Sequence, residues 1–225
     1  MRRALRLALL CCAVGPTWAG SGVEFNTDLV SQYVFRGRSM HQGVSVQPTL
    51  SYGILDSLKA SFWSNFRLEN SIALSETNYS LQWSWLNPSP AALTVGGIYY
   101  DRSSKTRLPK TAEVFAGVDF SVPGNPGVYA FYDCDRQVGT YWQVQASHRF
   151  VLPSHRGTVD LSAALGFDTG RVNNFQDARL SLGFTRHLGE WRLRPQVDFN
   201  FPSGSIDPGV HAFRPVFRVN IGRTF

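Results

Sequence analysis

The sequence predicts an all-β fold: a transmembrane up-and-down antiparallel β-barrel of twelve strands, closed by its first and last strands. Three observations predict it. From Val23 onward, apolar and polar residues alternate with period two, as in strands with one apolar face. The alternating runs are mostly about twice the length of soluble strands, and a tilted strand needs about 9–11 residues to cross a bilayer. Short turns alternate with longer loops, as in outer-membrane barrels.

The composition excludes several classes of protein. With 43% hydrophobic and 13% aromatic residues among 225, the chain is too apolar to be intrinsically disordered. After the first twenty residues, the sequence contains no apolar stretch of about 18 residues that would cross a membrane as a helix. Its three cysteines are too few for a disulfide scaffold or a thiolate metal site. The length fits a single domain.

The N-terminal residues 1–19 have the pattern of a secretory signal peptide. Three arginines precede the apolar run Leu7–Val14, which is too short to span a membrane. Small residues at Thr17 and Ala19 suit cleavage after Ala19. We therefore expect export, with 20–225 as a single outer-membrane barrel domain.

A lipoprotein signal is the alternative interpretation, because Cys11 and Cys12 follow the apolar run. Leu10 suits it poorly, since a small residue normally precedes a lipidated cysteine. Cleavage after the signal would leave Cys134 alone, most simply as a small apolar filler. The formal net charge of +6 includes the arginines of the signal, so it does not indicate a nucleic-acid partner.

The predicted strands are defined by their alternation. Segments 77–85, 112–120, 159–168 and 191–201 show it most clearly. The twelve predicted strands are 23–36, 43–53, 57–68, 75–86, 91–102, 110–122, 127–135, 139–151, 157–168, 175–187, 190–201 and 213–225. The residues expected to face outward include Leu81, Val114, Leu161, Leu182 and Val197.

The connections between these strands fall into two alternating sets. One set is short and rich in turn-forming residues, which places it at the periplasmic rim with both termini. The short connections are 56–57, 87–90, 123–127, 153–157 and 188–189. The other set is longer and more polar: 69–74, 102–109, 135–138, 169–174 and 202–212. Only 202–212 looks long enough to fold deeply into a lumen.

Aromatic residues concentrate near the strand ends, which indicates two interfacial girdles. Those predicted near the longer loops are Tyr33, Phe35, Tyr99, Tyr100, Trp142, Phe167, Phe201 and Phe213. The chain ends on Phe225, with Phe217, Val219 and Ile221 on the same face. This ending resembles the C-terminal signature of bacterial outer-membrane proteins, which implies recognition by the barrel assembly machinery.

Residues 31–39, Ser-Gln-Tyr-Val-Phe-Arg-Gly-Arg-Ser, and 47–53, Gln-Pro-Thr-Leu-Ser-Tyr-Gly, carry a family resemblance. They resemble the opening hairpin of the TorF-type porins, a proteobacterial group. The match covers residues 27–53, about an eighth of the chain. The resemblance implies an outer-membrane pore-like protein and names no solute.

Charged residues on the polar faces are the candidate lining of a lumen. The candidates are Asp28, Lys59, Arg67, Glu113, Asp119, Asp133, Arg149, Arg179, Arg192, Arg194 and Arg218. Opposed basic and acidic walls would orient polar solutes in a constriction. Alternatively, neighbouring charges pair with each other, as Arg179 with Asp198, to fill a narrow interior. We also expect Arg192, Arg194 and Arg218 to converge on one wall and to need carboxylates nearby.

Arg36 allows two interpretations of its own. It marks a ligand or pore-mouth position, or it fixes the tight turn before Gly37 through carbonyl contacts, and we favour the second. Ser147 and His148 do not suggest a hydrolase, because adjacent strand residues point to opposite faces. The sequence carries no nucleotide loop, zinc spacing or calcium loop. We therefore predict no enzymatic activity, no cofactor and no metal.

The leading functional hypothesis is an outer-membrane channel for small polar solutes, with membrane lipids as its surroundings. The first alternative is a closed structural or adhesive barrel whose loops bind partners. The second is a soluble periplasmic β-protein, which would bury the apolar faces against a second sheet.

Overall fold

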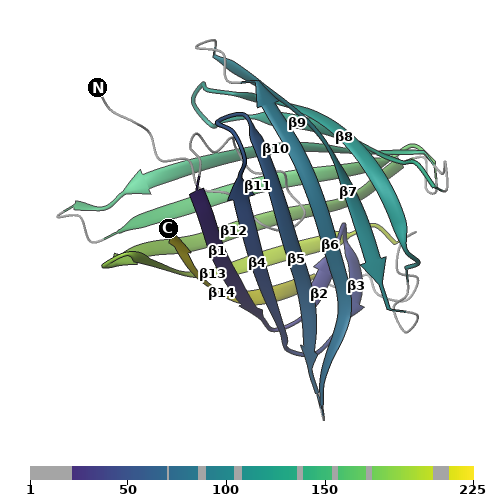
Figure 1. Ribbon diagram of the computed structural model, residues 1–225, viewed down its shortest axis with the longest axis horizontal. Coiled ribbons are helices and arrows are strands. Elements are labelled where there is room, and N and C mark those ends of the chain that lie inside the picture. Colours follow the sequence, from purple (N-terminus) through teal and green to yellow (C-terminus); the bar gives the residue numbers. More distant parts are fainter. Residues whose placement is uncertain are drawn as a thin grey trace.

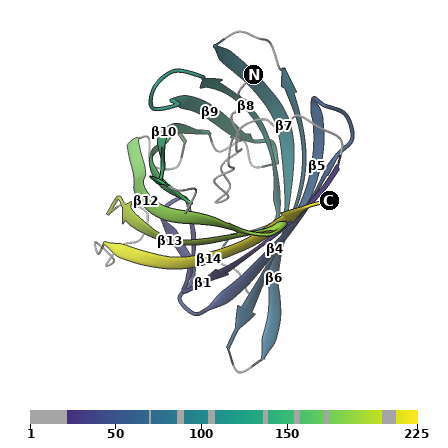
Figure 2. The ribbon, with the colours of Figure 1, turned by 90° about the vertical axis from the view of Figure 1, so that its left-hand side faces the viewer.

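Twelve antiparallel strands close on themselves in the computed structural model (Figures 1 and 2). The structure describes residues 22–69, 71–85, 90–103, 108–135, 139–153, 157–170, 174–204 and 213–225. The predicted signal peptide, 1–19, and most of the predicted loop 202–212 lie outside the described residues.

The wall strands agree closely with the predicted ranges. The first six are β1 (Gly22–Val30), β4 (Ser45–Gly53), β5 (Leu58–Leu68), β6 (Ile72–Trp85), β7 (Ala91–Arg102) and β8 (Thr111–Phe120). The others are β9 (Gly127–Asp133), β10 (Thr140–Val151), β11 (Thr158–Asp168), β12 (Asn174–Leu188), β13 (Trp191–Pro202) and β14 (Arg214–Thr224). Each wall strand pairs antiparallel with its neighbours around the barrel.

Pairing of the first and last strands closes the barrel, as predicted. β1 runs antiparallel to β14, from Glu24 opposite Thr224 to Val30 opposite Arg218. Closure leaves no strand edge exposed, which matters in hydrocarbon because each unpaired backbone group there costs several kcal/mol. The even strand number brings the start of β1 and the end of β14 to one rim, here called the terminal rim. The opposite rim, where β1 leaves the wall, is called the long-loop rim.

One predicted strand is wrong in its second half. The sequence predicts 23–36 as a single wall strand, but the wall strand ends at Val30. Residues 33–41 instead form a separate two-stranded hairpin of β2 (Tyr33–Phe35) and β3 (Arg38–His41). Arg36 and Gly37 both have positive φ, 46° and 76°. Positive φ at both central residues is the requirement of a tight type I′ hairpin turn, so the chain reverses there.

The outer face of the wall is apolar. Leu81 and Val114 are each 50% exposed, and Leu161 and Leu182 are exposed too. Val197 is half-buried but lies opposite Leu182 in the β12–β13 register, so it also faces outward. The predicted strand parity is therefore confirmed.

Three residues assigned to the outer aromatic girdle lie inside instead. Tyr33 and Phe35 are each 6% exposed, and Tyr100 is fully buried. They pack together, and the Phe35 and Tyr100 ring centroids are 5.8 Å apart. The prediction is wrong because it placed these rings only by their nearness to the ends of the predicted strands. Tyr33 and Phe35 belong to the hairpin, and Tyr100 follows the inward parity of β7.

A second aromatic cluster fills the interior beside β7–β10. It consists of Phe115, Tyr129, Phe131 and Tyr141. Glycine on a neighbouring strand makes room for one of these rings, since a Cβ at Gly117 would overlap the Tyr129 ring. The two aromatic clusters narrow the lumen on this side.

Candidate functional site

The hairpin β2–β3, here called the inserted hairpin, enters the lumen from the long-loop rim (Figure 1). Its turn residue Arg36 reaches the wall at β8. There its two terminal nitrogens donate hydrogen bonds to the two carboxylate oxygens of Glu113, each 2.7 Å long. The exposed fractions of the two side chains are 12% and 8%. Such a bidentate pair fixes orientation as well as distance.

Aromatic rings surround the Arg36 guanidinium. Its central carbon lies 4.8 Å from the centroid of Phe131 and 4.2 Å from that of Tyr141, both on wall strands. Tyr100 donates a hydrogen bond of 2.9 Å to Oε2 of Glu113, the oxygen that also accepts from Arg36 Nη2. Arg36 therefore fixes the inserted hairpin to the wall through Glu113. The predicted role of Arg36 in its own turn, through carbonyl contacts, is therefore wrong, and Arg36 does not stand free at a pore mouth.

Further contacts hold the inserted hairpin on two other sides. The amide of Gln176 on β12 donates to the carbonyl oxygen of Arg36 at 2.9 Å. The hydroxyl of Tyr33 donates to Glu76 on β6 at 3.2 Å. A Cβ at Gly37 would lie 2.7 Å from the Asp177 Cβ, so the turn approaches β12 closely enough to require glycine. The hairpin thus contacts β6, β8 and β12.

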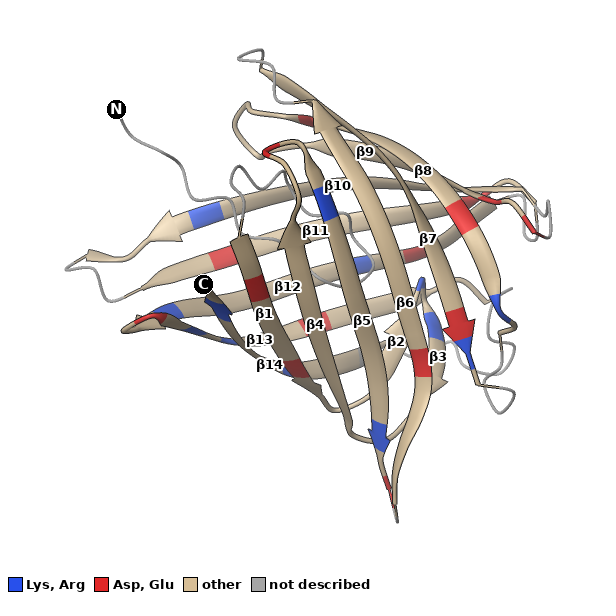
Figure 3. Ribbon diagram, in the orientation of Figure 1, with Lys and Arg blue, Asp and Glu red and all other residues tan. Residues whose placement is uncertain are grey.

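The predicted arginine group lies on one wall and has carboxylate partners. Arg218 on β14 lies 3.1 Å from Asp28 and 3.2 Å from Asp198. Arg192 on β13 lies 3.7 Å from Glu24. Figure 3 shows acidic and basic positions on both halves of the barrel wall. The repulsion between these arginines is therefore offset by adjacent acids.

Other predicted candidates also pair with near neighbours. Arg149 donates to Asp160 at 2.6 Å, and Arg194 lies 3.9 Å from the same carboxylate. Lys59 on β5 lies 3.9 Å from Glu24. At these positions the geometry matches the second interpretation, in which neighbouring charges fill the interior. A role in lining a solute path stays a prediction for each of them.

The acidic candidates on β8 and β9 accept hydrogen bonds from hydroxyl groups. Asp119 accepts from Tyr129, and Asp133 accepts from Thr111 at 2.5 Å. Both carboxylates are at least nine-tenths buried. Arg67 lies half-buried near the long-loop rim, opposite Ser45 of β4.

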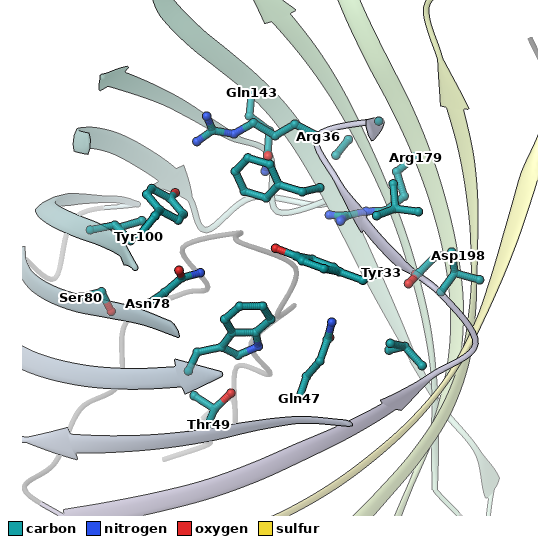
Figure 4. Close-up of a pocket in the computed structure, with 18 of the residues that line it drawn as sticks. Tyr33, Arg36, Gln47, Thr49, Asn78, Ser80, Tyr100, Gln143, Arg179 and Asp198 are labelled. Carbon is teal, nitrogen blue, oxygen red and sulfur yellow. The ribbon is translucent and has the colours of Figure 1, made fainter. Parts of the chain in front are cut away.

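A cavity of about 150 Å³ remains between the inserted hairpin and the wall (Figure 4). Figure 4 shows Asn78 and Ser80 across the cavity from Arg179 and Asp198, with Tyr33 between them. The hydroxyl and amide residues of this cavity are not among the predicted lining residues, which were all charged. Strand parity was the available signal, since Asn78 and Ser80 share the inward parity of β6.

Two oppositely charged residues that form an ion pair are also absent from the predicted lining residues. Glu76 on β6 and Arg102 on β7 form a pair with 3.2 Å between Arg102 Nε and a carboxylate oxygen. The Arg102 guanidinium lies 5.2 Å from the centroid of Phe35. Both follow inward parity, which would have identified them.

The described residues contain no group of three or more His, Cys, Asp or Glu arranged to hold a metal ion. Ser147 lies on the inner face and His148 on the exposed outer face, so the two side chains point apart. Within the described part of the chain, no helix is long and apolar enough to cross a membrane.

Comparison with known proteins gives matches among solved structures. The NanC porin matches with a TM-score of 0.57 and 10% identity, over 90% of this chain and 100% of that chain. An outer membrane channel from Pseudomonas putida F1 matches with a TM-score of 0.52 and 11% identity, over 97% of this chain and 100% of that chain. The translocator domain of the autotransporter NalP from Neisseria meningitidis matches with a TM-score of 0.52 and 13% identity, over 92% of this chain and 89% of that chain.

These structural matches establish the fold alone, because the identities are so low. No family model matches the chain. No curated protein matches it either. The resemblance to the TorF-type porins therefore stays a prediction.

Proposed function

We propose that this protein is a channel of the bacterial outer membrane that passes small polar solutes past the inserted hairpin. The exposed apolar outer face supports a lipid surrounding, because a strand surface of this kind is costly to expose to water. Two of the similar solved barrels are themselves described as a porin and a channel. The proposal includes export by the signal peptide, contact with outer-membrane lipids, and assembly through the strand that ends at Phe225.

The observation that carries the proposal is the space inside the barrel. Barrels of eight strands have interiors that side chains fill. Here twelve strands enclose a whole hairpin, and a cavity of about 150 Å³ is left beside it. The inserted hairpin occupies the lumen together with side chains of the wall, and a shift of the hairpin would leave room for a path beside them.

Planar-bilayer recording on the refolded protein tests the proposal. We expect discrete conductance steps, small because the inserted hairpin narrows the lumen. A complete absence of steps from correctly folded protein would contradict the channel.

The same hairpin favours a second candidate, a closed structural or adhesive barrel. Its aromatic packing and the Arg36–Glu113 pair hold it inside the lumen. In that case the recordings would show no conductance while the protein still folded. We propose no enzymatic activity for either candidate.

A further inference from the structure

The wall on one side of the cavity is rich in uncharged hydrogen-bonding groups, and the charged residue among them, Lys59 of β5, lies 3.9 Å from Glu24. Strands β4, β5 and β6 contribute hydroxyl and amide side chains, namely Gln47, Thr49, Ser61, Asn78, Ser80 and Gln82. Hydroxyl and amide groups both donate and accept hydrogen bonds. Such a wall therefore matches a neutral solute that also carries donors and acceptors.

Asn78 provides the most specific feature of this wall. Its side chain is 7% exposed, and no described protein group donates a hydrogen bond to its Oδ1. Its neighbours differ, since the Gln47 amide donates to Asn65 at 2.8 Å, and Asn65 donates to Ser75 at 2.7 Å. A buried acceptor without a donor is unfavourable. A solute hydroxyl in the cavity would supply that donor.

Aromatic surface lies next to this acceptor. Trp63 of β5 lines the cavity, and its ring centroid is 5.6 Å from that of Tyr33 on the inserted hairpin. Ligand sites commonly combine aromatic surface with a few placed polar groups. The carbon backbone of a solute would pack on Trp63 while its hydroxyl groups face the polar wall.

The charged residues on the opposite side of the cavity have partners within the described part of the protein. Arg36 donates to Glu113, and Asp177 accepts from Tyr141. Arg179 interacts electrostatically with Asp177 and Asp198. Arg218 lines the cavity but lies 3.1 Å from Asp28 and 3.2 Å from Asp198. A charged solute would lose hydration here without gaining an unpaired partner, which is costly. The volume of about 150 Å³ is also below the roughly 300–1,000 Å³ of pockets for drug-sized ligands.

We infer that this cavity is a binding site for a small, uncharged, polyhydroxylated solute, with Asn78 accepting a hydrogen bond from it and Trp63 packing on its carbon chain. The inference names a solute class for the proposed channel and rests on it, because the solute must reach the cavity from outside.

Three probes with the same six-carbon polyhydroxylated chain test the role of charge. Sorbitol is neutral, gluconate is an anion and glucamine is a cation. Binding to the full protein in detergent is measured by saturation-transfer NMR titration at physiological salt. We expect sorbitol to bind at least about tenfold more tightly than either charged probe, because neither finds a free countercharge. Equal binding of gluconate or glucamine would overturn the inference.

A substitution tests the role of Asn78. We expect Asn78→Ala to weaken sorbitol binding by about threefold to tenfold, the effect of one lost hydrogen bond. The matched control is Asn125→Gly, which changes an asparagine at a positive-φ turn on the terminal rim, outside the cavity. The control should bind sorbitol like the unaltered protein. Unchanged binding by Asn78→Ala would overturn the assignment of this residue.

The binding and conductance measurements test the solute class and the channel separately. Conductance without selective sorbitol binding would overturn the solute class and leave the channel in place. Selective binding without conductance would overturn the channel, and the cavity would then be a ligand site in a closed barrel.

Discussion

Replacing Glu113 by glutamine should release the inserted hairpin from the wall. The carboxylate accepts two hydrogen bonds of 2.7 Å from Arg36 in a site where both side chains are largely buried. Removing one partner of a buried ion pair costs about 3–5 kcal/mol, because the other charge is left uncompensated. Glutamine keeps one acceptor oxygen, so we expect a cost of about 2–3 kcal/mol. At about 1.4 kcal/mol per factor of ten, the undocked population should rise about 30- to 140-fold.

Limited digestion with trypsin measures that population. The bonds after Arg36 and Arg38 lie in the inserted hairpin and become cleavable when it leaves the lumen. When opening and closing are fast, the cleavage rate follows the open population. Cleavage after the exposed Lys110 serves as the internal reference. Glu113→Gln should therefore raise cleavage in the hairpin about 30- to 140-fold relative to that reference.

Two further variants distinguish the loss of the Arg36–Glu113 ion pair from a general disruption of the barrel interior. Asp119→Asn changes another buried acid on β8 that accepts from Tyr129, and it should leave hairpin cleavage unchanged. Replacing both partners, Arg36→Met with Glu113→Leu, removes the unpaired charge. It should restore protection after Arg38, because apolar replacement of a buried pair is often neutral. A cleavage rate for Glu113→Gln within about threefold of the unaltered protein would refute the role given to this pair.

Two other predictions concern the lumen wall. Replacing Arg192, Arg194 and Arg218 by glutamine should shift the reversal potential toward cations, most strongly in dilute electrolyte because salt screens charges beyond roughly 8 Å at physiological strength. An unchanged potential at low salt would mean that these arginines only stabilise the interior. Gly117→Ala should lower the free energy of unfolding by about 1–3 kcal/mol, since its Cβ would overlap the Tyr129 ring. Denaturant unfolding measures this change, and an unchanged free energy of unfolding would contradict the close packing of that ring.

The wall strands were predictable because each presents one apolar face outward and one polar face inward, and this arrangement produces the period-two alternation of the sequence. A strand such as β11 (Thr158–Asp168) has one apolar face on the outside of the barrel and one polar face on the inside, so its sequence shows both. The predicted range 157–168 differs from it by a single residue. Closure follows from the same reasoning, because an open edge in lipid is too costly.

The inserted hairpin was not predictable from that pattern. Tyr33 and Phe35 continue the alternation of β1, so they look like the outer end of a wall strand. The turn at Arg36 and Gly37 is a local signal, but it does not say whether the hairpin stays outside or enters the lumen. That choice depends on Glu113, which is 77 residues away along the chain.

The sequence predicted which charged residues face the inside of the barrel, but it did not predict which residues they pair with. Parity placed Arg218 inside the barrel, and its contacts with Asp28 and Asp198 depend on the register of two strand pairs. Asn78 was missed for a different reason. Parity also places Asn78 inside the barrel, but it does not distinguish this side chain from its inward neighbours until the structure shows that its oxygen lacks a donor.

The central claim is that the inserted hairpin limits passage through an otherwise open barrel. Its most direct test is the single-channel conductance of a variant in which residues 32–43 are replaced by a short glycine–serine turn joining β1 to β4. Heat-modifiable migration on gels confirms that the variant barrel has folded. We predict small conductance steps for the unaltered protein and several-fold larger, persistent steps for the variant. Equal conductance of the two folded proteins would contradict the claim.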